Sequence, residues 1–351
     1  MNRQIASRIS GENRGERAMV QLLMAVSVWR TAAVRIIPVF GASGWWMALL
    51  CMLPGIAAAL LLRVAMALTG VSTATEAVRI CLGRIGAGAF SAVLAALLLA
   101  EAVSAMTALL CVFTQVVGTR GTRFTLAVLT GAVMLFSLHR EGLPRAVYLL
   151  RWLMGTAALV AAGYALGDAR LDHLFPLHGT GDSYAIAGFL SVPGLAWPVT
   201  LLLTLPPCER RGRLCSAVAP LSAAVATVFI AAVTVPHELL IRRASLAETL
   251  LLPAWFAPNA VRVLWLCLLM LTFFLAMAAC IQQAARHISA PVGCIPGWLA
   301  IVLLVGLVLT QAAEPRMLME LLALVEPWLL LALGMTALTM IPLAIIRRIR
   351  P

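Results

Sequence analysis

Apolar and polar positions alternate along this chain in long blocks, with apolar runs separated by short polar loops. A lipid bilayer has a hydrocarbon core of about 30 Å, which a helix of about 20 apolar residues can cross. At that length the pattern predicts about ten membrane spans. They lie near residues 18–38, 45–68, 87–117, 123–138, 145–166, 184–206, 214–236, 259–286, 297–313 and 319–346. The chain is therefore predicted to be an all-α integral membrane protein.

Two polar tails flank one polytopic membrane domain. Residues 1–17 form the N-terminal tail, residues 18–346 hold all the spans, and residues 347–351 form the C-terminal tail. The membrane domain divides into two halves, at about 18–166 and 184–346. The first apolar run has no small-residue cleavage site, so we expect no cleaved signal peptide.

The composition agrees with a lipid-facing surface. The chain is 62% hydrophobic and 11% charged, whereas a soluble domain carries about 25% charged residues. All 26 basic residues are arginines, and the net charge is +12. Such a charge favours nucleic acid as the partner of a soluble protein, but in a membrane protein it reflects basic cytoplasmic loops. We therefore expect the lipid bilayer, and no nucleic acid, as the surroundings of this chain.

Arginines in the short loops predict the orientation of the chain, because cytoplasmic loops are the ones enriched in Arg and Lys. With ten spans, most loop and tail arginines fall on one side. They are Arg3, Arg8, Arg14, Arg17, Arg79, Arg84, Arg140, Arg145, Arg210, Arg211, Arg213, Arg347, Arg348 and Arg350. Both termini are therefore expected in the cytoplasm, with the protein in a cell membrane. On the same side, residues 73–86 space apolar and polar groups like a short interfacial helix.

The sixth span carries Pro193 and Gly194 in its first half, with Ser191 just before them. Proline removes an intrahelical hydrogen bond and clashes with the preceding turn, so it breaks or kinks a helix. Freed backbone groups at membrane depth must face protein or a wet cavity. A broken helix that opens a second half is the layout of inverted-repeat transporters, which bind solutes or ions at the midplane. A tolerated proline kink is the alternative, and the break alone favours neither.

Two charges lie near the middle of predicted spans. Arg30 is about 18 Å along the first span and Glu101 about 20 Å along the third, at 1.5 Å per residue. A lone charge at that depth costs about 2.5–3.5 kcal/mol on insertion scales, so such residues pair and face the protein interior. We expect either an interior ion pair between them or an Arg30 that grips a ligand carboxylate through two parallel hydrogen bonds. The alternative is that the Arg30–Glu101 pair has a purely structural role.

Enzymatic and metal chemistry find little support in the sequence. His237 and Glu238 begin like a zinc-protease helix, but Ile241 stands where the second His is needed. The eight cysteines contain no Cys-x-x-Cys pair and lie mostly inside apolar runs. We therefore expect no enzyme activity, no metal and no cofactor.

Short motifs follow one another in a characteristic order along nearly the whole chain, from about residue 17 to 346. They are Ile37-Pro38, Gly44-Trp45-Trp46, Leu82-Gly83-Arg84-Ile85-Gly86, His139-Arg140-Glu141-Gly142, Leu174-Phe175-Pro176 and Leu205-Pro206-Pro207. In this order and spacing the chain resembles the spore-germination permease family. That family is the B-type membrane subunit of germinant receptors, within the amino acid–polyamine–organocation superfamily.

The resemblance implies a leucine-transporter-like bundle, a 5+5 inverted repeat of about ten helices with broken first and sixth helices. It implies a midplane pocket for a small germinant, such as an amino acid, between spans one, three, six and eight. In this chain the expected lining is Ser27, Arg30, Thr31, Glu101, Ser191, Gly194 and Thr272. It further implies A-type and C-type receptor subunits as partners and the inner membrane of a spore as the location.

The chain departs from the family at two positions of that pocket. Ala32-Ala33-Val34-Arg35 replaces a Gly-x-Gly segment of the first span, and Leu195-Ala196 follows Gly194 where the family often has an acidic residue. Three functions therefore stay open. They are a germinant-receptor subunit, an amino-acid transporter coupled to protons or sodium, and a non-transporting scaffold whose pocket has decayed.

Overall fold

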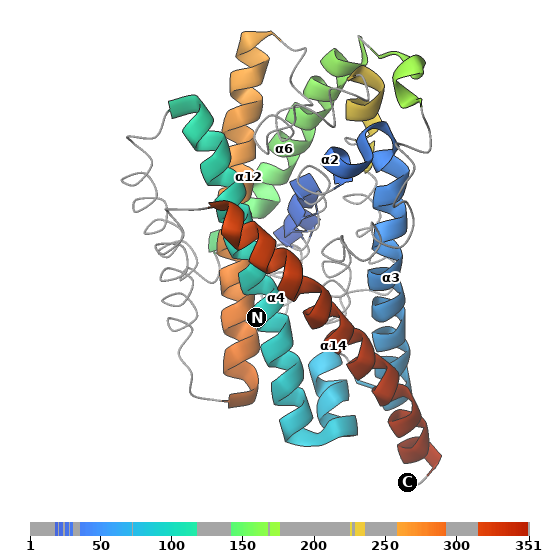
Figure 1. Cartoon of the computed structure of the whole chain (residues 1–351). Helices are drawn as coiled ribbons and strands as arrows, with labels where there is room; N and C mark the ends of the chain where they lie inside the picture. Colours follow the sequence, from blue (N-terminus) through green and yellow to red (C-terminus); the bar gives the residue numbers. More distant parts are fainter. Residues whose placement is uncertain are drawn as a thin grey trace, which may run out of the picture.

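The computed structural model (Figure 1) is helical throughout the part of the chain that it describes, with no strand in that part. The described residues are 18–19, 21–23, 25–27, 29–30, 36–71, 73–117, 142–167, 169–175, 225–226, 229–235, 258–292 and 315–349. In chain order the elements are α2 (Ile37–Phe40), the 3-10 turn η2 (Gly41–Ser43), α3 (Gly44–Thr69), α4 (Ala74–Val117), α6 (Gly142–Leu166), the 3-10 turn η3 (Leu171–Leu174), α12 (Asn259–Val292) and α14 (Pro315–Ile349). The residues described between 18 and 30 are also helical.

Within the described residues, four helices are long and apolar enough to cross a membrane. They contain Gly41–Thr69, Ala74–Leu109, Gly142–Leu166 and Asn259–Ala285, and α14 adds a shorter apolar stretch, Leu331–Ile346. The prediction of apolar helices at the second, third, fifth and eighth spans is confirmed. The spans predicted at 123–138, 184–206 and 297–313 lie outside the described residues.

The helices run beyond the predicted spans at several ends. α12 continues to Val292 instead of residue 286, and α14 covers Pro315–Ile349 instead of 319–346. Hydropathy marks only the part of a helix that suits lipid. The backbone hydrogen bonds continue past it through polar residues, so these helices are longer than their apolar stretches.

The centre of the molecule is the contact between α4 and α12, which lie side by side with α14 crossing α3 and α4 (Figure 1). All residues from 100 to 109 of α4 are buried, and so are all residues from 275 to 284 of α12. Each stretch covers almost three helical turns at 3.6 residues per turn. A helix buried on every side over that length is surrounded by protein.

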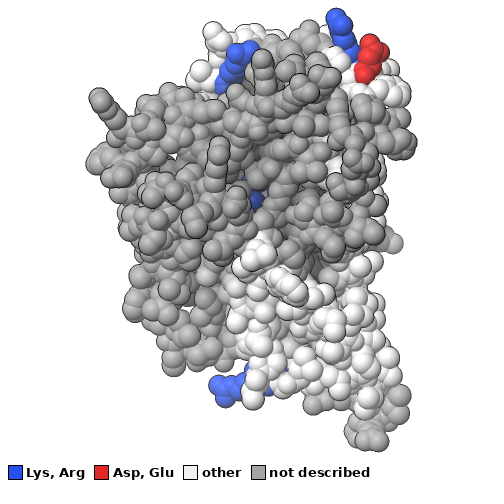
Figure 2. All heavy atoms as spheres, in the orientation of Figure 1, with Lys and Arg blue, Asp and Glu red and all other residues white. Residues whose placement is uncertain are grey.

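The two ends of the bundle carry different loops (Figure 1). The connection between α3 and α4 lies at the same end as the C-terminal ends of α12 and α14. The turn α2–η2, the end of α6 and η3 lie at the other end, where Arg170 N–H donates to the Val233 carbonyl at 2.8 Å. In Figure 2 the described charges gather mainly at the two ends, and the described surface between them is largely uncharged.

An elbow divides α4 into a short segment, residues 74–82, and a long one, residues 84–117. At the elbow Gly83 has φ 78° and ψ −170°, a backbone region that only glycine adopts readily. A Cβ on Gly86 would overlap the Cβ of Leu82, so the turn also requires glycine there. The short segment buries Ala74, Ala77, Val78 and Cys81 and exposes Glu76 and Arg79. Of the interfacial helix predicted at 73–86, the helix is confirmed up to Leu82, where the elbow ends it, and its apolar face packs into the protein core.

Replacing Gly83 by alanine is expected to lower the free energy of unfolding by about 1–3 kcal/mol, because alanine is strained in that backbone region. Thermal unfolding of the purified protein in detergent measures the change. Gly88→Ala is the matched control, since Gly88 is helical and a Cβ there meets nothing within 4 Å. Equal melting temperatures for the two variants would contradict the strained elbow.

Candidate functional site

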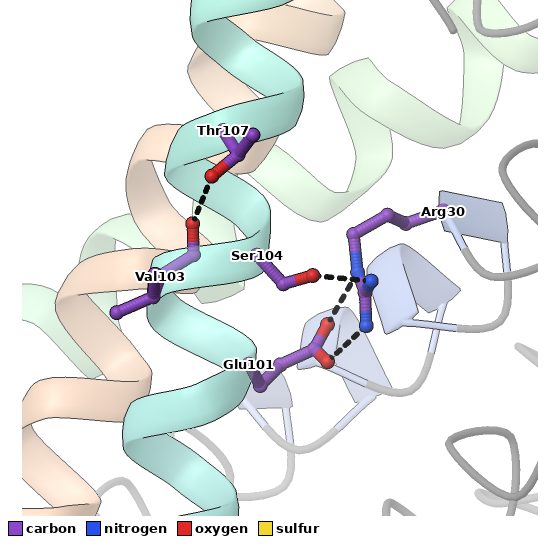
Figure 3. A network of polar contacts seen from close by, with 5 residues as sticks. All are labelled: Arg30, Glu101, Val103, Ser104 and Thr107. Atoms are coloured by element: carbon purple, nitrogen blue, oxygen red, sulfur yellow. Dashed lines mark hydrogen bonds and ion pairs between the residues drawn. The ribbon is translucent and has the colours of Figure 1, made fainter. Parts of the chain in front are cut away.

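A polar cluster lies in the surrounded part of α4. Glu101 and Ser104 are one turn apart on α4 and face the same side, as residues three apart do on a helix (Figure 3). Arg30 reaches them from the first helix, so the cluster joins two elements that are about 70 residues apart in sequence. The side chains of Arg30 and Glu101 are 0% and 1% exposed. Glu101 also lies at the centre of the long segment of α4, which runs from residue 84 to 117.

The guanidinium of Arg30 grips the Glu101 carboxylate with two parallel hydrogen bonds. Arg30 Nε donates to Glu101 Oε1 at 3.2 Å, and Nη2 donates to Oε2 at 2.5 Å. A third donor, Nη1, bonds the Ser104 hydroxyl oxygen at 2.5 Å. The ion pair predicted between Arg30 and Glu101 is therefore confirmed. Its bidentate form is the strongest geometry that an arginine and a carboxylate can adopt.

This arrangement fixes the Arg30 guanidinium inside an apolar bundle in a position where it binds a carboxylate. Removing either partner would leave a buried charge without compensation, whereas exchanging one carboxylate for another would keep every hydrogen bond. A small solute with a carboxylate could therefore compete with Glu101 for Arg30. The released Glu101 would then need a proton or another cation, because an unpaired buried carboxylate is costly.

The other predicted site residues meet different outcomes. Ser27 is fully buried one turn before Arg30 on the same helix. Thr272 is half-buried on α12, and its hydroxyl donates to the Leu268 carbonyl at 2.5 Å. That bond is internal to α12 and gives no sign of a pocket. Thr31, Ser191, Pro193 and Gly194 lie outside the described residues, so the predicted break of the sixth span stays a prediction.

Sequence reasoning missed Ser104 and several buried polar side chains on α12. Ser104 carried a signal, because it lies three residues after Glu101. On α12, Cys280 is fully buried in the helix that packs against α4. Gln282 and Gln283 follow it, with exposures of 4% and 3%. The buried stretch of α12 therefore carries polar side chains among its apolar ones.

Arg151 is another arginine inside a predicted span, the fifth, and the sequence reasoning passed over it. Its Cζ lies 4.1 Å from the ring centroid of Tyr148 and 5.1 Å from that of Trp152. A cation over aromatic faces is stabilised by the ring quadrupoles. Among the described residues this arginine is therefore held by rings on α6, and Arg30 is held by a carboxylate.

The described residues give no support for a metal or cofactor site. None of them form a group of three or more His, Cys, Asp or Glu side chains placed to hold a metal ion. In comparisons with known proteins, no family model and no curated protein matches the chain. The resemblance to the spore-germination permeases therefore stays a prediction.

Proposed function

We propose that this chain is a permease-like membrane protein that binds a small carboxylate-bearing solute, such as an amino acid, at Arg30. The observation that carries the proposal is the buried bidentate pair with Glu101, at the centre of the long segment of α4. Ionisable residues inside membrane spans are rare, and they mark substrate or ion pathways. Without solute, the Arg30 guanidinium is hydrogen-bonded to the Glu101 carboxylate. On binding, the solute carboxylate replaces the Glu101 carboxylate on Arg30.

The proposed architecture is a bundle of about ten spans in two inverted halves, with broken first and sixth helices. The order of motifs between residues 17 and 346 favours a germinant-receptor subunit in a spore inner membrane, with both termini in the cytoplasm. On that reading, binding at Arg30 signals to A-type and C-type subunits during spore germination. Genes for those subunits beside this one would support the receptor over a transporter.

A non-transporting scaffold is the second candidate function. It is favoured by the closure of the cluster, in which Glu101 and Ser104 together engage all three nitrogens of the Arg30 guanidinium. In that case the pair only fixes the first helix against α4. The scaffold has no ligand, which separates the two candidates experimentally.

The test is a thermal-shift screen of the purified full chain against amino acids, nucleosides and sugars. A true ligand at 100 times its Kd stabilises the folded state by about 2.7 kcal/mol, a shift of several degrees in Tm. The matched ligand is the amide of the same amino acid, which lacks the carboxylate and should give no shift. Stabilisation by sugars and amides alone would contradict the role of Arg30, and no stabilisation by any solute would favour the scaffold.

Ser104→Ala is the variant of choice for the same screen, because it removes one hydrogen bond to Arg30 and leaves the ion pair in place. We expect a loss of about 1 kcal/mol in folding stability and a changed Kd for the solute. Uptake of the labelled solute into proteoliposomes then tells a transporter from a receptor. Receptor and transporter share the ligand, and only the transporter moves it.

A further inference from the structure

The elbow of α4 exposes an apolar tip between two arginines. Ile85 is 90% exposed and Leu82 is 37% exposed, while Arg79 and Arg84 on either side are exposed as well. The short segment does not lay its own apolar face on lipid, because that face is packed into the protein core. What remains free is the tip itself, with its isoleucine and its two guanidinium groups.

The position of the elbow supplies the surroundings that this tip needs. It lies at the end of the bundle where α3 joins α4 and where α14 ends (Figure 1). The helices between the two ends are apolar enough to cross a membrane, so this end lies near a membrane–water boundary. There an exposed isoleucine can insert among acyl chains while neighbouring arginines stay at the level of the headgroups.

Charge selects the kind of headgroup. Arg79 and Arg84 are balanced by one acidic residue on the short segment, Glu76. The elbow therefore has a net positive charge. Arginines at a membrane boundary attract anionic lipids, and the guanidinium fork suits phosphate oxygens.

We propose that the elbow of α4, residues 79–86, is a docking site for anionic phospholipid headgroups. Arg79 and Arg84 bind the phosphate, and Leu82 and Ile85 insert beside the lipid chains. The glycines serve this site by turning the chain sharply, since Gly83 and Gly86 allow the tip to project. The site is independent of the proposed solute site at Arg30, because it uses other residues at the end of the bundle.

Native mass spectrometry of the full chain with equal amounts of phosphatidylglycerol and phosphatidylcholine tests the proposal. We expect the wild type to retain phosphatidylglycerol preferentially. Each of Arg79→Gln and Arg84→Gln should lower that preference roughly fivefold, the effect of one basic residue near an anionic surface. Arg170→Gln is the matched control, because Arg170 is exposed and directly precedes η3, which lies at the opposite end of the bundle (Figure 1). A wild type without preference, or a double variant that keeps it, would overturn the site.

A second measurement places the tip directly. Ile85→Cys, labelled with a fluorophore and reconstituted in vesicles, should be quenched by lipids with brominated chains and only weakly by iodide in water. The wild type labelled in the same way gives the background from native cysteines. Strong iodide quenching would show the tip in water and reject insertion. Both measurements read lipid contact alone, so their failure leaves the solute site untouched, and failure of the solute screen leaves this site untouched.

Discussion

Arg30→Ala is expected to lower the free energy of unfolding by about 3–5 kcal/mol, the cost of leaving one member of a buried ion pair alone. The reason is the Glu101 carboxylate, which is 1% exposed and bonded to two nitrogens of Arg30. Without the guanidinium it must stay charged in a dry site or take up a proton. Glu101→Ala should have a similar effect through the stranded arginine. Chemical or thermal unfolding in detergent micelles measures both changes.

The exchanged pair, Arg30→Glu with Glu101→Arg, separates pairing from other causes. It restores opposite charges at the same two positions, so we expect part of the lost stability to return. Arg170→Ala is the control for loss of an arginine, because Arg170 is exposed and surface substitutions stay within about 0.5 kcal/mol. An exchanged pair no more stable than the two single variants would refute the pairing as the source of stability.

Much of the described fold could be predicted from hydropathy, because lipid imposes one simple requirement on a spanning helix. The ends of α3, Gly44 and Thr69, lie one residue from the predicted span at 45–68. The ion pair could be predicted for the same physical reason. A charge near mid-depth must find a partner, and the first and third spans each carried one.

The third member of the cluster and the shape of α4 required the structure. Ser104 is one of several small polar residues on α4, and only the direction of Arg30 decides which of them is used. Helix breaks show the same limit. Pro54 lies inside α3 without ending it, whereas α4 breaks at Gly83, where the backbone adopts a conformation open to glycine. Residue type alone does not say which turn the packing will force.

The sequence also did not predict that stretches of α4 and α12 are buried on all sides. This burial leads to a second large expected effect on folding stability. Ala279→Leu is expected to destabilise the protein by about 1–3 kcal/mol through overpacking. Ala279 is 0% exposed, and so are its neighbours Ala278 and Cys280. A longer side chain therefore has no lipid-facing direction to take, and small residues at a membrane helix contact are what allow the backbones to approach closely. Thermal unfolding reports the loss.

The same substitution at Ala260 is the control, because Ala260 is exposed near the start of α12 and should tolerate leucine within about 0.5 kcal/mol. A further consequence follows from the position of Ala279 in the buried stretch of α12, which packs on α4, the helix that carries Glu101. A leucine that pushes α12 away from α4 should loosen the Arg30–Glu101 cluster as well. Ala279→Leu and Arg30→Ala should then be less than additive in a double-mutant cycle, since they damage one shared contact. Full additivity would mean that the α4–α12 contact and the ion pair are held independently.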